Sequence, residues 1–260
     1  GDNRFGIRGV FNRAWLNDRG AQWTSELTVG NEPRLFTELY QPTRWDRKRF
    51  IAPYLDLYKT PLSVFQGGDN RLARYDIRRI RAGADLGTTF GTAAEARLGG
   101  YYGYTSPDLD TGDPLLETDD ITDSAIRFVY VYDMLDDSFL PRSGNRISLR
   151  VNWPLEALGA DLEYTRLQAE WRGAFSSGPH SLLGTVRAGT SFDDPMPYWD
   201  RFALGGFLNL SGYNMDQFRG NKLAYGNLVY FRKVAAFPAP LGRGLYLGGS
   251  LEVGRLWDTE

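Results

Sequence analysis

The feature that most constrains the fold of this chain is a two-residue alternation of charged and apolar side chains along its extended runs. Residues 163–172 alternate without interruption, so that Leu167 and Trp171 share one face while Arg166 and Arg172 share the other. Successive side chains of a β-strand point to opposite faces. The pattern therefore predicts strands with one apolar face and one charged face, and it recurs along the whole chain.

A charged face of this kind restricts what the strands can build. In the dry core of a β-sandwich, every buried arginine would need a partner to offset its desolvation. A wide, water-filled lumen tolerates the same charges, and the apolar face then meets lipid, where all backbone groups must pair within a closed sheet. We therefore predict an all-β fold, a transmembrane antiparallel β-barrel, and we count roughly a dozen strands from the spacing of the turns.

Composition excludes several other classes of protein. The formal net charge of −2 gives no basic bias, so we expect no nucleic acid partner. The absence of cysteine removes disulfides and thiolate metal sites. No apolar run approaches the roughly 20 residues that a spanning helix requires. The mean hydropathy of −0.40 is typical of soluble proteins, but a barrel also has a low value because only alternate residues face lipid.

The chain is predicted to form a single domain, residues 1–260. It opens at Gly1 and stops at Glu260 shortly after a strand-like run, so we expect a barrel that is truncated at both ends. Two connections are long. Residues 106–120 are acidic and rich in proline and glycine, whereas residues 193–221 hold aromatic residues and glycines in place of the usual polar filler. Long loops at one end and short turns at the other are typical of outer-membrane barrels.

The sequence contains no constellation of residues that would support catalysis. The single histidine, His180, lies in a predicted hairpin turn with no nucleophile or metal ligand to pair with it. Residues 248–252 resemble a nucleophile elbow but lack its closing glycine. The acidic residues within 108–120 lack the regular spacing of a calcium site, so solvated loop charge is the better interpretation. We predict no catalytic residue, metal or cofactor in this segment.

Three segments carry motifs with structural content, and the first is a turn. Asp137, Phe139, Pro141 and Gly144 occur in close succession just before the alternating run that begins at Arg146. Proline fixes φ and glycine can adopt a positive φ. These residues therefore predict a tight turn that leads into a strand.

The second segment lies in the long connection and the third in the last strand-like run. The second is marked by small, aromatic and basic residues, which are Gly205, Gly206, Leu210, Ser211, Gly212, Tyr213 and Arg219. In the third, alternation places Leu251 and Val253 on the lipid face and Glu252 on the lumen face, and Gly254 follows. An inward carboxylate at this point is a suitable acceptor for a donor on the loop.

Together the three segments resemble the barrel of the outer membrane protein 85 superfamily, whose sixteen-stranded barrels carry periplasmic POTRA domains. The resemblance implies that the turn at residues 137–144 is periplasmic. It also implies that Leu-Ser-Gly-Tyr at residues 210–213 corresponds to a (V/I/L)-R-G-(Y/F) tetrad on an extracellular loop that folds back into the lumen. The segment with Glu252 and Gly254 looks like the F-x-D-x-G strand motif that receives the arginine of that loop, with Leu251 for Phe and Glu252 for Asp.

Ser211 stands where the superfamily has its arginine, which puts the usual ion pair between loop and wall in doubt. We expect Arg219 to substitute for it by contacting Glu252, or else Glu163 or Glu170 on neighbouring inner faces.

Two larger groups of side chains also have predicted places. Aromatic residues near strand ends are expected in the lipid-interface girdles rather than in a sugar-binding platform. These residues are Trp15, Trp23, Tyr101, Tyr102, Trp153 and Trp171.

Arginines of the charged faces are expected to form a lumen network that holds the infolded loop, in preference to an anion path. These residues are Arg78, Arg79, Arg81, Arg127, Arg150, Arg166 and Arg187. Within the loop, Phe207 and Tyr213 are expected to act as anchors.

With Ser211 in place of the arginine, residues 204–213 look most like the barrel of patatin-like phospholipase autotransporters, the d subclass of type V secretion. In that family a patatin lipase passenger, one POTRA domain and the barrel form one polypeptide. The resemblance implies a translocation barrel in the bacterial outer membrane that exports or anchors a fused passenger. The implied partners are outer-membrane lipid, a passenger in cis, lipopolysaccharide and the barrel-assembly machinery. Two alternatives from the same superfamily, a barrel-assembly insertase and a two-partner secretion transporter, stay open, as does a diffusion porin from another class.

Overall fold

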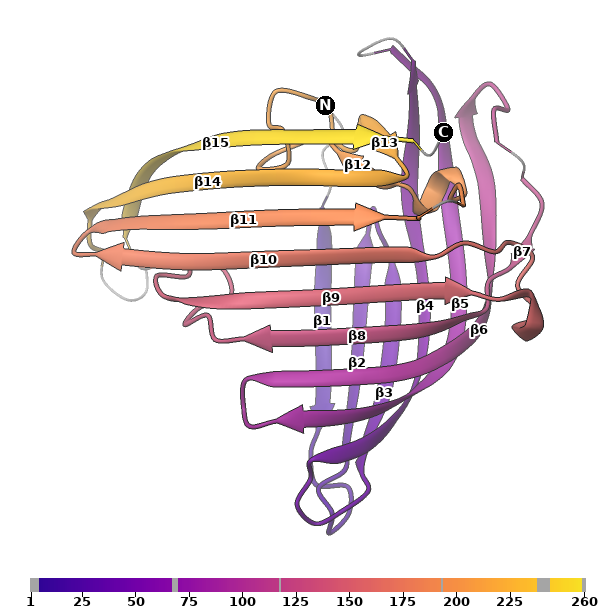
Figure 1. Ribbon diagram of the computed structural model, residues 1–260, viewed down its shortest axis with the longest axis horizontal. Helices are drawn as coiled ribbons and strands as arrows, with labels where there is room; N and C mark the ends of the chain where they lie inside the picture. The colour runs from indigo at the N-terminus through magenta and orange to yellow at the C-terminus, as the bar shows by residue number, and fades with distance from the viewer. Residues whose placement is uncertain (1–4, 67–69, 117, 193, 238–243, 259–260) are drawn as a thin grey trace.

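The computed structural model describes residues 5–66, 70–116, 118–192, 194–237 and 244–258, and antiparallel strands dominate it (Figure 1). The strands of the main sheet are β1 (Gly6–Arg13), β2 (Gln22–Gly30), β3 (Arg34–Pro42), β4 (Arg49–Gln66), β5 (Asn70–Phe90), β6 (Ala94–Gly112), β7 (Ile121–Thr122), β8 (Ala125–Asp133), β9 (Gly144–Pro154), β10 (Arg166–Ser177), β11 (His180–Thr190), β14 (Lys222–Ala235) and β15 (Leu245–Trp257). Among the described residues, no helix combines the length and the apolar character needed to span a bilayer.

The long connection between β11 and β14 has some structure of its own. It holds the short 3-10 helix η2 (Tyr198–Asp200) and a separate two-stranded hairpin of β12 (Phe202–Leu204) and β13 (Phe218–Gly220). A second 3-10 helix, η1 (Glu156–Leu158), follows β9.

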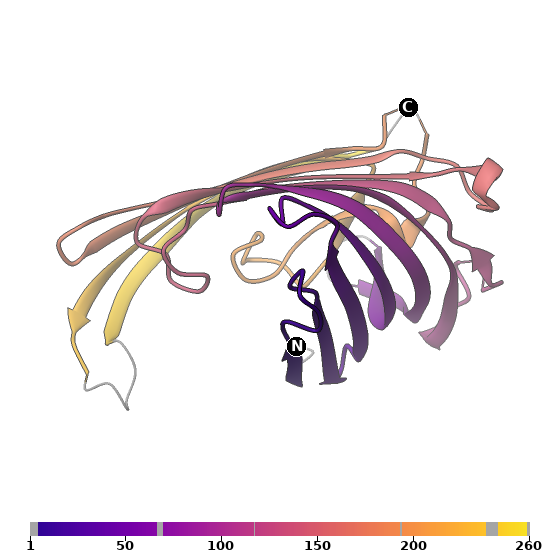
Figure 2. The same ribbon diagram turned by 90° about the horizontal axis from the view of Figure 1, so that it is seen from below.

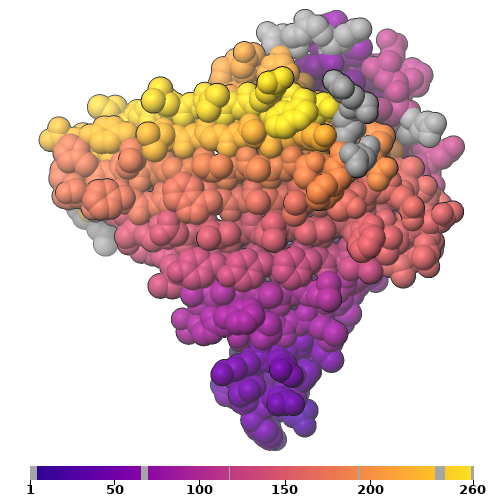
Figure 3. All heavy atoms as spheres, viewed as in Figure 1, coloured from indigo at the N-terminus to yellow at the C-terminus, as the bar shows by residue number. Residues whose placement is uncertain are grey.

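The strands pair in sequence order along one curved sheet, from β1 to β6 and then β8, β9, β10, β11, β14 and β15, with β7 beside β6. In Figure 2 the sheet arches over a concave side, and the connection between β11 and β14 lies beneath the arch. The space-filling view in Figure 3 shows the convex face, with β8 to β15 side by side across it. The predicted all-β antiparallel fold, with about a dozen strands, is confirmed.

The predicted alternation assigns the two faces of this sheet. On β15, Leu247, Leu251 and Val253 are exposed on the convex face, whereas Glu252 points to the concave face and contacts the connection between β11 and β14. Directly paired residues on adjacent strands share a face because the side-chain period is two. The convex face is therefore the lipid face and the concave face lines the lumen.

The two ends of the strands carry different connections. At one end the connections between described strands range from two residues, at 178–179, to ten, at 134–143. At the opposite end the chain forms the longer connections at residues 155–165 and 191–221. This asymmetry is typical of outer-membrane barrels, in which the short turns are periplasmic.

The acidic segment 106–120 is a connection only in its second part, which corrects the prediction. β6 continues to Gly112 because β5 is long enough to pair with it there. Arg78 was expected in the lumen, but it lies on the outer face and donates to Asp108 at 2.6 and 2.7 Å. The reason is the strand period: its neighbour Arg79 faces inward, so Arg78 cannot.

The long strands β4, β5 and β6 extend beyond the lipid-facing part of the sheet. On the outer face of β5, Ile80 is exposed and apolar, whereas the next outward position, Arg78, is ion-paired. The outer lipid boundary therefore falls between these two residues. Beyond it, the inner face of the extension forms a buried apolar cluster against the loop residues Tyr198 and Trp199. The buried members are Leu62, Val64, Ala73, Tyr75 and Ile77.

Most of the predicted girdle aromatics lie on the outer face. Those exposed there are Trp23, Tyr102, Trp153 and Trp171. Tyr101 points inward instead, since it is adjacent to Tyr102, and its hydroxyl donates to Asp123 at 3.1 Å. Trp15 is also placed differently, because it lies under the guanidinium of Arg47 and lines a lumen cavity of about 380 Å³.

Two aromatic rings in the lumen cover glycines on the neighbouring strand. Phe50 lies opposite Gly87 and Tyr54 opposite Gly83 in the pairing of β4 with β5. A Cβ at Gly87 would lie 2.1 Å from Cζ of Phe50, and a Cβ at Gly83 would lie 2.6 Å from the hydroxyl oxygen of Tyr54. Both rings are buried. The two glycines therefore let aromatic side chains lie flat against the wall.

We expect Gly87→Val to lower the free energy of unfolding by about 1–3 kcal/mol, because the new side chain must displace the Phe50 ring. The measurement is denaturant-induced unfolding of the protein in detergent micelles. Gly249→Val on β15 is the matched control, since a Cβ there meets nothing within 4 Å. Similar stabilities for the two variants would contradict this packing.

Candidate functional site

The turn between β8 and β9 is held by two aspartates. Oδ1 of Asp137 accepts the N–H groups of Phe139 and Leu140 at 2.8 and 2.9 Å. Oδ1 of Asp136 accepts the N–H groups of Arg142 and Ser143. These backbone hydrogen bonds, that from Arg142 first, lower the pKa of Asp136 below its ordinary value. Side-chain carboxylates that accept nearby backbone N–H groups stabilise a turn in place of the hydrogen bonds of a helix or strand.

Gly144 closes this turn in the conformation that the sequence predicts. Its φ is +100°, and a Cβ at this position would lie 1.9 Å from the carbonyl oxygen of Met134. Pro141 is buried, whereas Phe139 is exposed at the tip. The turn lies at the end of the sheet with the short turns, opposite the end that carries the 191–221 loop.

The tip of the 191–221 loop docks on Glu252 of β15. The N–H of Leu210 donates to Oε2 of Glu252 at 2.7 Å, and the N–H of Ser211 donates to the same oxygen at 3.1 Å. The Ser211 hydroxyl donates to Oε1 at 2.7 Å, and Ser250 on the wall also donates to Oε1, at 2.8 Å. The carboxylate is thus fully engaged by neutral donors, each bond being charge-assisted.

Arg219 does not take the place of the missing arginine, so that prediction is wrong. Its Nη1 donates to the carbonyl of Arg201 at 3.5 Å, and its Nη2 lies 3.9 Å from Asp216 of the same loop. Its guanidinium lies over the ring of Tyr198. The physical reason is that Ser211 and its neighbour already saturate Glu252, which leaves no lone pair facing a distant cation.

The glycines of the loop shape its tip. Gly205 and Gly206 have φ of +123° and +103°. A Cβ at Gly205 would lie 2.1 Å from the carbonyl oxygen of Asn214, so only glycine fits at this crossing. At Gly212 a Cβ would meet nothing within 4 Å. The tip returns on itself through the bond from the Gly206 N–H to the Tyr213 carbonyl at 3.1 Å.

The predicted aromatic anchors do not hold the tip to the wall. Phe207 is 85% exposed, and Tyr213 is 50% exposed with its ring edge-on to Phe218 of the same loop. The wall contacts near the tip are polar instead: the Tyr225 hydroxyl donates to the carbonyl of Leu208 at 2.6 Å. The tip is therefore fixed by hydrogen bonds and by Leu210, which packs against the buried cluster that includes Leu223 and Tyr225, and not by the two predicted aromatic anchors.

The base of the loop is held by a buried carboxylate that sequence reasoning did not single out. Asp200 accepts from Nη2 of Arg79 on β5 at 2.7 Å and from the hydroxyl of Tyr164. Nε of Arg166 on β10 donates to its carbonyl at 3.1 Å. Burial opposes ionisation of Asp200, but the cations of Arg79 and Arg81 outweigh burial and lower its pKa to about 2. The loop base thus links β5 to the start of β10.

Two apolar side chains of β12 complete the base. Phe202 fits against Gly189 of β11, where a Cβ would lie 2.4 Å from its ring. Leu204 fits against Gly254 of β15, where a Cβ would lie 2.8 Å from Cδ1 of Leu204. Gly254, predicted as a wall partner of the loop, therefore supplies room for a leucine of the loop base.

The inward arginines divide between the loop and the wall. Arg79 and Arg166 contact Asp200, and Arg187 donates to the amide oxygen of Asn209, also in the loop. Among the described residues, the remaining arginines of this predicted group either have an ion pair elsewhere or have none. Arg81 pairs with Asp123, Arg127 pairs with Asp85, and Arg150 donates to Ser148.

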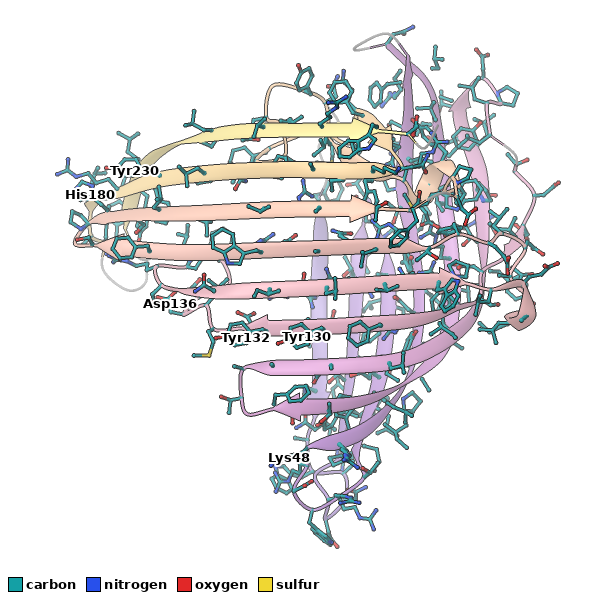
Figure 4. All side chains as sticks on the ribbon, viewed as in Figure 1. Lys48, Tyr130, Tyr132, Asp136, His180 and Tyr230 are labelled. Carbon is teal, nitrogen blue, oxygen red and sulfur yellow. The ribbon has the colours of Figure 1, made fainter. Side chains whose placement is uncertain are left out.

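The side chains that could suggest catalysis are engaged in structure. Nδ1 of His180 lies 2.7 Å from the hydroxyl oxygen of Tyr230, and Figure 4 shows this pair at the β10–β11 hairpin. Within the described ranges, no group of three or more His, Cys, Asp or Glu side chains is arranged to hold a metal ion.

We expect Asp200→Asn to lower the free energy of unfolding by about 3 kcal/mol, because Arg79 then stays buried without a counter-ion. The measurement is denaturant unfolding in micelles. Asp108→Asn is the matched control: it breaks an Arg–Asp pair that is exposed to solvent and contributes little to stability. Equal losses in the two variants would show that the base is not held by Asp200.

A pH dependence follows from the same carboxylate. The folded-state pKa of Asp200, about 2, lies below its ordinary value of 3.8, so the stabilisation is complete above about pH 4 and is lost as pH falls towards 2. The loss corresponds to roughly 2 kcal/mol. Unfolding measured between pH 5 and pH 2 should show this loss in the wild type and a smaller one in Asp200→Asn.

Comparison with known proteins agrees with this geometry. A family model described as the Omp85 superfamily domain matches residues 17–259. Among 72 solved chains that match, BamA from Haemophilus ducreyi lacking POTRA domains 1–3 has a TM-score of 0.73 at 12% identity, with 98% of this chain and 55% of that chain covered. No curated protein matches in sequence. The chain thus spans about half of that structure and shares its fold. It belongs to the Omp85 superfamily and is a β-barrel of the bacterial outer membrane.

Proposed function

We propose that this barrel is a translocation barrel that exports or anchors a passenger polypeptide fused to it in cis. The observation that carries the proposal is the neutral dock of the loop tip, in which Leu210 and Ser211 supply the donors to Glu252. An arginine in this place would form an ion pair with the wall. The bonds of this dock are exposed, so water can replace the neutral donors at the carboxylate when the tip leaves, and no loop cation is separated from its counter-ion.

The loop is built to move at its tip and stay fixed at its base. The base is held by Asp200 and by the close packing of Phe202 and Leu204 against glycines of the wall. The tip is joined to the base through Gly205 and Gly206, both at positive φ. Rotation at this pair would carry the tip away from the wall while the base keeps the sheet curved. The lumen then widens for a polypeptide without loss of the barrel.

The passenger best suited to this proposal is a patatin-type lipase. Its support is the resemblance of residues 204–213 to the barrels of patatin-like phospholipase autotransporters, including Ser211 in place of arginine. The barrel itself takes no part in ester hydrolysis in this scheme. Contact with lipopolysaccharide would fall at the outer lipid boundary, beside Lys59 and Arg78, which are paired with Asp76 and Asp108. Insertion of the barrel would rest on the barrel-assembly machinery.

A barrel-assembly insertase is the second candidate, because the fold matches that of BamA. A two-partner secretion transporter would act on a separate polypeptide, and a diffusion porin would pass small solutes.

Deletion of the gene in its native host separates these functions. Export in cis predicts that protease-accessible passenger is lost from the surface of intact cells while the levels of other outer-membrane proteins stay unchanged. A general fall in those levels would instead establish the insertase, and loss of an exported protein encoded elsewhere would establish the two-partner transporter. Solute uptake as the only affected property would establish the porin.

We expect Glu252→Leu to impair export, because the N–H groups of Leu210 and Ser211 and the Ser211 hydroxyl all lose their acceptor. Loss of three charge-assisted bonds should destabilise the docked tip by about 2–4 kcal/mol after partial rehydration. The measurements are passenger exposure on intact cells and the temperature of heat-modifiable migration on gels. Asp113→Asn in the exposed acidic segment is the control and should behave as wild type. Wild-type export by Glu252→Leu would remove the tip from the mechanism.

A further inference from the structure

The periplasmic turns that join β1 to β2 and β3 to β4 carry concentrated positive charge. Residues 43–49 form the second turn, which is closed by the bond from the Thr43 N–H to the Arg49 carbonyl at 2.9 Å. Residues 13–21 and 43–49 together hold six basic and two acidic residues, a net formal charge of +4. The basic residues are Arg13, Arg19, Arg44, Arg47, Lys48 and Arg49, and the acidic residues are Asp18 and Asp46.

The two turns lie side by side and present one surface. The guanidinium of Arg47 lies over the ring of Trp15, 4.4 Å from its centroid. Nδ2 of Asn17 in the first turn donates to Oε1 of Gln41, just before the second turn, at 2.8 Å. Figure 4 shows Lys48 among the turns at the lower end of the view. The charges of both turns therefore act on the same surroundings.

The cations of these turns are exposed and have no carboxylate within ion-pair distance among the described residues. Asp46 accepts the backbone N–H of Lys48 at 3.1 Å and forms no ion pair with the neighbouring cations. Arg47 also lines the lumen cavity that contains Glu38 and Glu95, so it belongs to the lumen. The remaining five cations, which we call the basic rim, are Arg13, Arg19, Arg44, Lys48 and Arg49.

The basic rim borders the lipid face of the sheet. Arg49 lies two residues before Ile51 on β4, so both side chains point outward, and Ile51 is exposed there. Arg13 pairs with Trp23, an exposed aromatic residue of the outer face. Trp45, in the second turn, is 72% exposed. Tryptophan is enriched where a bilayer meets water, so these cations lie at the level of the lipid headgroups.

The other described turns at the periplasmic end carry no comparable charge. Residues 91–93 and 178–179 contain no charged side chain. Residues 134–143 contain Asp136, Asp137 and Arg142, so that turn has one more acidic than basic residue. Positive charge in the described turns is therefore concentrated at the ends of β1 to β4.

We propose that the basic rim binds the headgroups of anionic phospholipids in the periplasmic leaflet and holds the ends of β1 to β4 at headgroup level. A guanidinium can donate two parallel hydrogen bonds to a phosphate, and lysine adds a point charge. The long stems of Arg13 and Arg49 can lie along the apolar face while their charged ends reach the headgroups. An acidic protein is the competing partner, but Arg13 and Arg49 lie on the face that lipid covers.

The test uses the full-length protein in mixed micelles that contain equal amounts of phosphatidylglycerol and phosphatidylcholine with the same acyl chains. Native mass spectrometry counts the lipids that stay bound. We expect phosphatidylglycerol to be enriched on the wild type and Arg49→Gln to weaken its binding about fivefold. Arg150→Gln is the matched control: it removes an exposed cation from the lumen face, which lipid does not reach, and should leave binding unchanged. Heat-modifiable migration verifies that each variant is folded.

Two further arms fix the ligand class. Inorganic phosphate at the concentration of the lipid should not displace phosphatidylglycerol, and displacement would overturn the inference in favour of a simple anion site. Equal retention of the two lipids by the wild type would also overturn it. So would equal retention of phosphatidylglycerol by the wild type and Arg49→Gln, which would leave an acidic protein as the partner of the basic rim.

Discussion

The buried pair of Asp200 and Arg79 is the interaction on which the interior of this barrel depends. Arg79 would be expensive to bury without an anion, and Asp200 arrives from a segment more than a hundred residues away in the chain. Because the pair also engages Tyr164 and Arg166, it fixes the loop base against two separate parts of the wall. The apolar contacts of Phe202 and Leu204 with wall glycines require the base to be in this position.

The loop therefore combines two kinds of attachment. Its base uses a buried ion pair and close apolar packing, which tolerate little displacement. Its tip uses hydrogen bonds from neutral donors to one wall carboxylate, which water can replace bond by bond. Single arginines of the wall differ in a similar way: Arg127 is paired with Asp85, whereas Arg150 has only a 3.4 Å contact with the hydroxyl of Ser148.

The fold was predictable from the sequence because the period of two is a local property, visible in single runs such as residues 163–172. The position of Glu252 on the lumen face followed from the same period. The period did not predict which loop residue contacts Glu252. The choice between Arg219 and Ser211 depends on how the loop folds back, and no periodicity in the sequence encodes that. Asp200 was missed for a similar reason, although an acidic residue directly after Tyr198 and Trp199 in a long loop was a usable signal.

The extension of β4, β5 and β6 beyond the lipid boundary leaves strand edges that could pair with strands of other molecules. β3 pairs with β4 only as far as Tyr58, so the outer part of β4 has one side open. Strand edges of this kind recruit strands from other molecules. Pro61 interrupts the open edge on β4, and Pro107 does the same on β6, at neighbouring positions of the β5 ladder. Proline has no N–H to offer an incoming strand, and both prolines are themselves buried, so neither edge presents a free backbone donor at these two positions.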